Sequence, residues 1–214
     1  MFLSGCNLRC PWCHNSELVL GEADSKVTLP QAMAHLRKRR QVLGGVVLSG
    51  GEPCLWDGLF DLIKEIKRLS LPVKLDTNGM FPEILEKLIC NEETRPDFIA
   101  MDLKLAPERY IELIPSGGKP ANPAEALIRS STLIRSSGIA HEFRTLCLPE
   151  KYIAEKDLAA LSHLALDSPW HIRPFRGGNC LDSTWDSLQV SEEEEKSMAE
   201  LMANLVKFPP PFQE

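Results

Sequence analysis

The sequence has no long apolar run and no excess of positive charge, and these absences argue against several classes of protein. No stretch approaches the roughly 20 consecutive apolar residues of a membrane-spanning helix, so we expect no membrane association. The first residues lack the charged start and long apolar core of a secretion signal, which indicates a cytoplasmic protein. The formal net charge of −6 disfavours general binding to nucleic acid.

Seven cysteines are present, and three of them fall within eight residues, at Cys6, Cys10 and Cys13. Thiols stay reduced in the cytosol, so clustered cysteines predict a metal site rather than disulfides. Three thiolates would leave one iron of a four-iron cluster without a protein ligand, which is typical of a reactive site. A zinc site completed by His14 is one alternative, and chance clustering is another. The other four are far apart and are expected to be buried or incidental thiols: Cys54, Cys90, Cys147 and Cys180.

Short apolar runs alternate with amphipathic stretches along the chain, a pattern typical of a parallel α/β sheet. The β-like runs are Phe2–Ser4, Val46–Ser49, Val73–Asp76, Phe98–Asp102, Glu142–Leu148 and His171–Phe175. The helical stretches are Leu29–Leu43, Gly58–Leu69, Pro82–Cys90, Ala124–Ile134, Ala154–Leu166 and a last helix capped by Ser191. Six strand–helix units are too few for an eight-unit barrel. We therefore expect a partial (βα)6 barrel, TIM-like and mostly parallel, with an extra C-terminal helix.

We expect one domain over residues 1–207, followed by a proline-rich tail over residues 208–214. The segment Pro115–Pro123, rich in Gly, Pro and Ser, is predicted to be a loop. The basic run Arg37–Arg40 is interpreted as a solvated helix face. Strands average about five to six residues, so Phe2–Ser4 is short, and we expect a truncated start or a misassigned initiator.

The three clustered cysteines belong to the run Cys6-Asn7-Leu8-Arg9-Cys10-Pro11-Trp12-Cys13, directly after the first predicted strand. The C-x3-C-x2-C spacing resembles the cluster motif of the radical S-adenosylmethionine (SAM) superfamily. The resemblance implies that Cys6, Cys10 and Cys13 bind a 4Fe–4S cluster, whose open iron is chelated by the amino and carboxylate groups of SAM. It also implies that Trp12 contacts the adenine, although a lone tryptophan is more often part of a core.

The segment after the second predicted strand has a second resemblance to the same superfamily. Gly50-Gly51-Glu52-Pro53 is similar to its GGEP segment, which implies contact with the methionine amino group. The two glycines allow close approach of a ligand, and the Glu52 carboxylate suits an ammonium group. In isolation, Gly50-Gly51 would be interpreted as a turn at the end of a strand.

Segments on the next three predicted strands resemble those of glycyl-radical-enzyme activases. They are Asp76-Thr77-Asn78-Gly79, Asp102-Leu103-Lys104 and Glu142-Phe143-Arg144-Thr145. The resemblance implies cofactor contacts or counter-charges at Asp76, Thr77, Asp102, Lys104 and Arg144. Taken alone, Asn78-Gly79 is a common turn signal, and Lys104 and Arg144 could be solvated charges at strand ends.

The positions of these segments give an independent physical argument. Each lies at or just after the end of a predicted strand, except Arg144, which lies within one. Parallel α/β sheets have their active sites at the carboxyl ends of the strands. We therefore expect one site that is built from all of these segments.

The most similar family is the anaerobic ribonucleoside-triphosphate reductase activating protein. The run Cys13-His14-Asn15, the segment Arg173–Arg176 and the pair Leu181-Asp182 extend the resemblance over about residues 1–182. It implies a radical SAM oxidoreductase that receives one electron from an external reductant such as flavodoxin or ferredoxin. Reductive cleavage of SAM then generates a glycyl radical on a partner enzyme, expected to be the anaerobic ribonucleotide reductase.

Two other functions are weighed against this expectation. A 7-carboxy-7-deazaguanine synthase would share the barrel and the cofactor, but those enzymes usually continue the third cysteine with Asp-Thr, and here His14-Asn15 follows. A non-catalytic iron–sulfur or zinc-binding module would need only the cysteines. The segments expected to contact SAM on the second to fifth strands argue against such a module.

Overall fold

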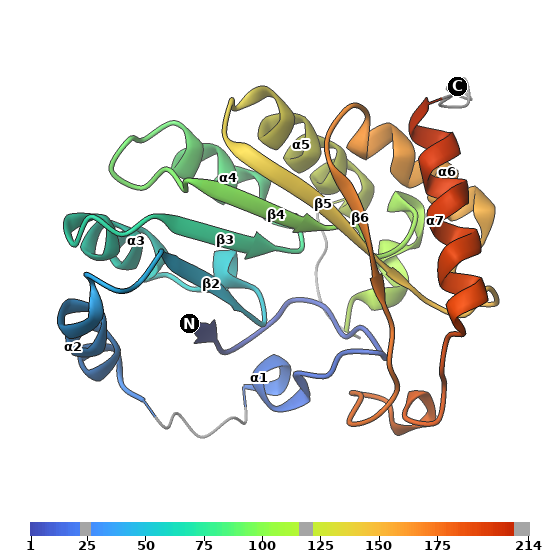
Figure 1. Ribbon diagram of the computed structural model, residues 1–214, viewed down its shortest axis with the longest axis horizontal. Helices are drawn as coiled ribbons and strands as arrows, with labels where there is room; N and C mark the ends of the chain where they lie inside the picture. Colours follow the sequence, from blue (N-terminus) through green and yellow to red (C-terminus); the bar gives the residue numbers. More distant parts are fainter. Residues whose placement is uncertain (22–26, 116–121, 208–214) are drawn as a thin grey trace.

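The computed structural model describes residues 1–21, 27–115 and 122–207. Six strands form one sheet in the order β1-β2-β3-β4-β5-β6, and every neighbouring pair is parallel. The strands are β1 (Phe2–Leu3), β2 (Val46–Gly50), β3 (Val73–Thr77), β4 (Phe98–Asp102), β5 (Ala140–Cys147) and β6 (Trp170–Pro174). The sheet is an open partial barrel, with β1 and β6 at its two edges (Figure 1).

Helices connect the strands. The α-helices are α1 (Ser16–Leu20), α2 (Leu29–Arg39), α3 (Leu59–Arg68), α4 (Pro82–Ile89), α5 (Pro123–Ser136), α6 (Glu155–Ala165) and α7 (Glu192–Lys207). Three short 3-10 helices are η1 (Pro53–Leu55), η2 (Pro107–Leu113) and η3 (Ser183–Trp185). Figure 1 shows α3, α4, α5 and α6 following one another along the same side of the sheet, as repeated crossovers of one hand require.

The main core lies between the sheet and these helices. On β3, Val73 and Leu75 are fully buried, whereas the alternating Lys74 and Asp76 are only partly buried. A strand turns successive side chains to opposite faces, so the charged residues lie on the face away from the core. Apolar residues at helical spacing bury one face of α3 completely: Leu59, Leu62, Ile63 and Ile66.

The predicted partial barrel, its parallel strands and its last helix are confirmed, with shifts of at most two residues at strand boundaries. Four short elements were not predicted, namely α1, η1, η2 and η3. The basic run Arg37–Arg40 ends α2 and is exposed, as expected. The predicted loop at 115–123 falls largely on residues 116–121, and the predicted tail on 208–214, both outside the described residues. In the described part of the chain, every helix is too short or too polar to cross a bilayer.

Candidate active site

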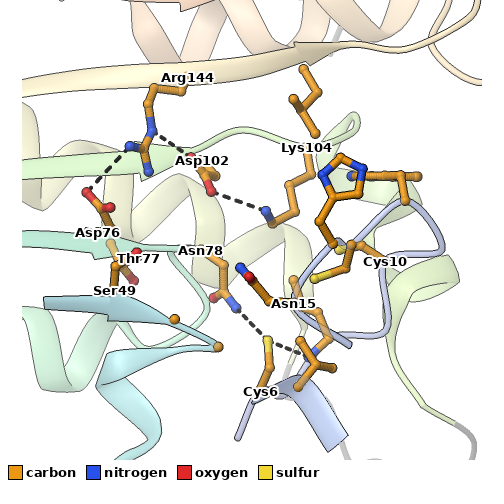
Figure 2. A pocket seen from close by; sticks show the side chains of 18 residues that line it. Cys6, Cys10, Asn15, Ser49, Asp76, Thr77, Asn78, Asp102, Lys104 and Arg144 are labelled. Atoms are coloured by element: carbon orange, nitrogen blue, oxygen red, sulfur yellow. Dashed lines mark hydrogen bonds and ion pairs between the residues drawn. The ribbon is translucent and has the colours of Figure 1, made fainter. Parts of the chain in front are cut away.

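The loop between β1 and α1 carries the three clustered cysteines, and all three line one cavity of about 230 Å³. We call residues 5–15 the cluster loop. Cys10 is buried, whereas Cys6 and Cys13 are partly exposed to the cavity. Figure 2 shows Cys6 and Cys10 facing the carboxyl ends of the central strands. The site therefore forms where the strand topology predicts it.

Backbone hydrogen bonds from distant segments hold the cluster loop in place. The Arg9 amide donates to the carbonyl oxygen of Leu113 at 2.7 Å. Two further amides, of Leu181 and Asp182, donate to the carbonyls of Cys13 and Pro11 at 2.8 and 3.0 Å. The loop is thus fixed by η2 on one side and by the segment after β6 on the other.

Gly50 and Gly51 end β2 against the start of the chain. Gly50 has φ +117°, and a Cβ there would overlap backbone atoms of Leu3. A Cβ on Gly51 would overlap the carbonyl oxygen of Gly5, and the Gly51 amide donates to the Leu3 carbonyl at 2.9 Å. Both glycines line the cavity, but close approach of the protein's own backbone is enough to require them.

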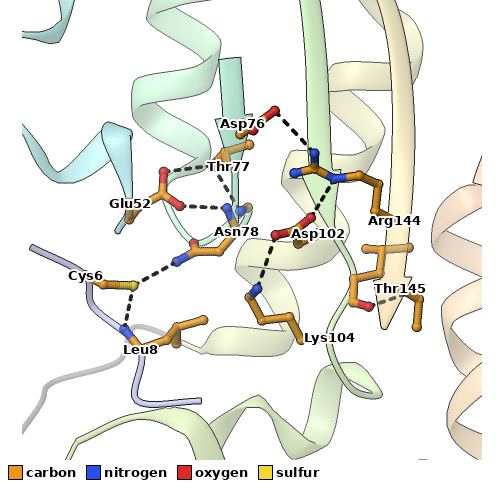
Figure 3. Close-up of polar contacts among 12 residues, drawn as sticks. Cys6, Leu8, Glu52, Asp76, Thr77, Asn78, Asp102, Lys104, Arg144 and Thr145 are labelled. Carbon is orange, nitrogen blue, oxygen red and sulfur yellow. Dashed lines mark hydrogen bonds and ion pairs between the residues drawn. The ribbon is translucent and has the colours of Figure 1, made fainter. Parts of the chain in front are cut away.

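Glu52 follows these glycines and is almost completely buried, with 1% of its surface exposed. Its carboxylate accepts hydrogen bonds from the amides of Cys54 and Asn78, at 3.0 and 2.6 Å, and from the Thr77 hydroxyl at 2.9 Å. Burial raises the pKa of Glu52 although these donors oppose the shift. Glu52 does not line the cavity, whereas its partners Thr77 and Asn78 do. Figure 3 shows the contacts of Glu52 with these two residues.

Four charged side chains from three neighbouring strands form a chain across the site (Figure 3). Arg144 on β5 donates from Nε to Asp102 at 2.8 Å and from Nη1 to Asp76 at 3.5 Å. Asp102, at the end of β4, also accepts from Lys104 Nζ at 3.3 Å. All four residues line the cavity.

These ion pairs control the protonation of the buried charges. Burial alone would raise the pKa of Asp102, but Lys104 and Arg144 outweigh it and lower the pKa below the usual value. For Lys104, burial alone would lower the pKa, and the Asp102 carboxylate outweighs it, so the pKa is raised. Lys104 and Arg144 are therefore cations, and Asp102 is an anion, at neutral pH.

Trp12 is buried at the wall of the cavity, with its ring centroid 5.2 Å from that of Trp185. His14 also lines the cavity and stacks on Phe175, with ring centroids 5.9 Å apart. Every residue that the sequence predicted for the site lines this cavity except Glu52.

Two residues that position the site were not singled out by sequence reasoning. The side-chain nitrogen Nδ2 of Asn78 donates to Asn7 Oδ1 at 2.8 Å and lies 3.8 Å from Cys6 Sγ. The buried Tyr110 hydroxyl accepts from the Lys104 amide at 2.8 Å and donates to the Asp102 carbonyl at 3.2 Å. Asn78 was detectable through its segment, whereas nothing local marks Tyr110.

The donor set of the cavity fits the expected cluster. Three free thiols face one space, and no fourth cysteine of the described residues lines it, which leaves an open coordination position. Burial raises the pKa of Cys6, and it raises the pKa of Cys10 to about 12, so binding must displace thiol protons. Within the described residues, no three His, Cys, Asp or Glu side chains converge on a single metal ion.

The cavity also fits the two charged groups of the methionine portion of SAM. Carboxylates of Asp76 and Asp102 and cations of Lys104 and Arg144 all face the same space as the thiols. Trp12 and Leu146 add an apolar wall on one side. A zwitterionic ligand with an aromatic base therefore finds complementary groups here.

Proteins with similar sequences include activating enzymes and synthases. A "Putative glycyl-radical enzyme activating enzyme" of Methanocaldococcus jannaschii is 28% identical over 91% of this chain and 80% of its own length. A 7-carboxy-7-deazaguanine synthase of Rhodospirillum rubrum is 31% identical over 62% of this chain and 59% of its own. A pyruvate formate-lyase-activating enzyme of Listeria monocytogenes is 32% identical over 56% of this chain and 52% of its own. The chain thus spans just over half the length of the two bacterial relatives.

Among solved structures, Streptococcus suis SuiB bound to S-adenosylmethionine superposes with a TM-score of 0.69 and 14% identity. The match covers 96% of this chain and 46% of that larger chain, and it shows the shared fold. The family model for the radical SAM superfamily matches residues 1–161, most of the barrel and all of the cluster loop. The chain therefore belongs to the radical SAM superfamily, and its cofactors are a 4Fe–4S cluster and S-adenosylmethionine.

Proposed function

We propose that this radical SAM enzyme is a glycyl-radical-enzyme activase, which removes a hydrogen atom from a backbone glycine of a partner enzyme. The observation that carries the proposal is the archaeal relative named as such an activating enzyme, which aligns over 91% of this chain. The run Cys13-His14-Asn15, which resembles that of activases, supports it. So does the open sheet, in which β1 and β6 are separate edges rather than neighbours in a closed barrel.

The finer proposal is that the partner is an anaerobic ribonucleoside-triphosphate reductase, with a flavodoxin or ferredoxin as the electron donor. It rests on the resemblance of segments Asp76–Gly79, Asp102–Lys104 and Arg173–Arg176 to that activase family. The similarity to a pyruvate formate-lyase-activating enzyme offers a second class of partner, and the experiment below includes it.

In the proposed mechanism, Cys6, Cys10 and Cys13 would hold the cluster and leave one iron open. When bound, the cluster and SAM supply one-electron reductive cleavage and an acceptor for the hydrogen atom of the substrate. The residues of the chain bind and orient. Lys104 and Arg144 are cations that can face a carboxylate of the bound cofactor, and Asp102 keeps both in position.

The positive charge of Lys104 also favours loss of the thiol protons of the nearby cysteines. Each thiol gives up its proton when it binds iron, and burial of Cys10 opposes this. The Lys104 ammonium acts in the other direction, because its positive charge favours the thiolate forms of Cys10 and Cys6. Trp12 and Leu8, both buried, line the cavity and exclude water from its apolar side.

A 7-carboxy-7-deazaguanine synthase is the second candidate, because the bacterial enzyme of that name aligns with 62% of this chain. That reaction acts on a small molecule and needs no partner protein. His14-Asn15 after the third cysteine argues against it, as does the lower coverage of the relative. The two functions differ in one observable: only an activase forms a glycyl radical on a partner protein, which electron paramagnetic resonance detects.

The test combines the anaerobically reconstituted chain, a one-electron reductant and SAM with each candidate partner in turn. We expect a glycyl doublet in the electron paramagnetic resonance spectrum of the anaerobic ribonucleotide reductase, with 5′-deoxyadenosine and methionine formed in equal amounts. A doublet on a pyruvate formate-lyase alone would keep the activase function and overturn the named partner. Conversion of a purine precursor, with no doublet on any partner, would overturn the activase proposal.

A further inference from the structure

A second cavity, of about 330 Å³, adjoins the first on the side of β6. The two cavities share part of their lining: Trp12, Asp102, Lys104, Arg144 and Leu146. The second cavity touches none of the three clustered cysteines and neither Gly50 nor Gly51. It adds Leu103 and Thr145, which are buried, and Arg173, which is half exposed. The two cavities are therefore adjacent parts of one space at the carboxyl ends of the strands.

Two of the three cations in this second cavity already have strong partners. Arg144 binds both Asp102 and Asp76, and Lys104 binds Asp102. Their charges are matched by carboxylates on the same strand ends, and the chain of ion pairs keeps their side chains in fixed positions. These two cations are therefore engaged by the carboxylates of the strand ends and by the cofactor contact proposed for them in the first cavity.

Arg173 differs from them. In the described part of the chain its guanidinium donates no hydrogen bond, and its one ion pair is with Glu142 at 3.8 Å. The same Glu142 oxygen accepts a hydrogen bond from Lys74 Nζ at 3.1 Å, so Arg173 is the weaker of its two partners. The side chain is 54% exposed. A planar fork with free donors at the mouth of a cavity is suited to bidentate recognition of a carboxylate.

The position of Arg173 matters as much as its free donors. It lies on β6, the last strand of the open sheet, one residue before the end of that strand. His171 precedes it on the same face and approaches Glu142 at 3.8 Å. Glu142 is thus shared by Lys74, His171 and Arg173, and Lys74 also pairs with Asp76 at 3.9 Å. Among the described residues, Arg173 has no carboxylate partner besides this shared one.

We propose that the second cavity is a substrate subsite in which Arg173 binds the carboxylate of an Asp or Glu side chain in the glycine-bearing segment of the partner. The inference rests on the proposed function and names a chemical feature of its substrate, an acidic residue close to the glycine. Arg173 sets which segment is accepted, while the ion-paired residues of the first cavity face the cofactor. The subsite therefore selects the peptide and takes no part in the cleavage of SAM.

The test measures binding of short synthetic peptides to the cluster-loaded chain in the presence of SAM, followed by tryptophan fluorescence. Each peptide has a central glycine and carries either one Asp at a chosen flanking position or an Asn at the same position. We expect the best Asp peptide to bind about tenfold more tightly than its Asn counterpart. Arg173→Gln should remove this preference, and Arg173→Glu should transfer it to a peptide with Lys in place of the Asp.

Arg176→Gln is the matched control, because Arg176 lies outside both cavities and pairs with Glu195. It should keep the preference for Asp. Iron content and melting temperature show whether each variant has folded. Three results would overturn the inference: no preference for Asp in the wild type, a preference that survives Arg173→Gln, or an Arg173→Gln variant that loses affinity for SAM instead of the peptide.

These measurements separate the inference from the function on which it rests. The glycyl doublet tests the activase reaction and needs the intact partner, whereas the Asp preference is read from peptide binding alone. A doublet without an Asp preference rejects the subsite and keeps the activase. An Asp preference that depends on Arg173, without a doublet on any partner, supports the subsite and rejects the activase reaction.

Discussion

At the scale of single residues, Glu52 is the side chain whose substitution has the clearest physical consequence. Its buried carboxylate accepts three hydrogen bonds, from Cys54, Thr77 and Asn78. In Glu52→Gln an amide nitrogen replaces one acceptor oxygen and meets a donor that it cannot satisfy. We expect the free energy of unfolding to fall by about 2 kcal/mol in urea denaturation. Glu83→Gln, on the surface, should change it by less than about 1 kcal/mol, and equal losses would contradict this role.

The thiol of Cys10 predicts a dependence of stability on pH in the metal-free protein. Burial raises its pKa from 9.0 to about 12. Between pH 9 and pH 12 the Cys10 thiol therefore keeps its proton in the folded chain and has lost it in the unfolded chain. The free energy of unfolding must therefore fall as the pH rises above 9, by up to about 1.4 kcal/mol per pH unit from this group. This contribution is fully present below pH 9.

Urea unfolding of the reduced, metal-free chain between pH 8 and pH 10.5 measures this effect. Relative to Cys10→Ala, which has no thiol at this position, the wild type should lose about 2 kcal/mol over that range. Cys90→Ala removes an exposed thiol and should give a curve parallel to that of the wild type. Parallel curves for Cys10→Ala and the wild type would show that burial does not raise the pKa of the Cys10 thiol.

Sequence reasoning identified most of the cavity through the resemblance of its segments to known motifs, and their positions supported this, since parallel strands end at one edge of a sheet. Asp76 and Asp102 were predicted at strand ends and Arg144 within a strand, although their mutual ion pairs were not predicted. The partners of Glu52 were also not predicted, because its contacts with Thr77 and Asn78 join the loops after two different strands. Local patterns show which residues end a strand, but they do not show which of them are buried.

At the scale of elements, the segment after β6 is tied to the cluster loop by aromatic packing. Trp185, in η3, is 3% exposed, and its ring centroid lies 4.0 Å from that of Tyr152 and 5.8 Å from that of Phe175. It also supports Trp12, which lines both cavities. Trp185 therefore connects the position of this segment to the wall of the active site.

We expect Trp185→Ala to lower the free energy of unfolding by about 3–5 kcal/mol, because it leaves a cavity among large buried rings. The variant should also retain less iron after anaerobic reconstitution, since the cluster loop loses its support. Chemical denaturation and iron analysis measure the two effects. Val42→Ala, at a position that is 72% exposed, is the apolar control and should change neither. Full iron retention in a destabilised Trp185→Ala would show that the loop does not depend on this packing.

Elements that the sequence did not predict share a physical property. The helix α1 has five residues and no side-chain cap, and the buried residues of the 3-10 helix η2, Pro107, Tyr110 and Leu113, repeat every three residues rather than at α-helical spacing. Their conformations depend on tertiary contacts, such as the Arg9 amide bound to Leu113 and the Tyr110 hydroxyl bound to Lys104. The long amphipathic helices and buried strands were predicted because their burial leaves a periodic pattern in the sequence.

At the scale of the whole molecule, the open barrel is bridged at one end. β1 and β6 are opposite edges of the sheet, and hydrogen bonds from Leu181 and Asp182 to the cluster loop connect them at the carboxyl ends of the strands. The cluster loop in this bridge also lines the cavity proposed to hold the cofactors. Ligands that bind the folded chain alone stabilise it through mass action, so they should stabilise the bridge together with the loop.

We therefore predict that loading with the 4Fe–4S cluster and SAM slows amide hydrogen exchange in two separate regions, residues 6–15 and residues 176–189. The amides of Leu181 and Asp182 should be among those protected, because their acceptors belong to the cluster loop, which is proposed to bind the cluster. At a SAM concentration of about 100 times its dissociation constant, mass action adds about 2.7 kcal/mol to stability. Anaerobic exchange detected by mass spectrometry measures the protection, and α3, on the far side of β2 and β3 from the cluster loop, is the internal reference. Cys10→Ala should show neither change, and protection confined to residues 6–15 would mean that the two edges of the barrel respond independently.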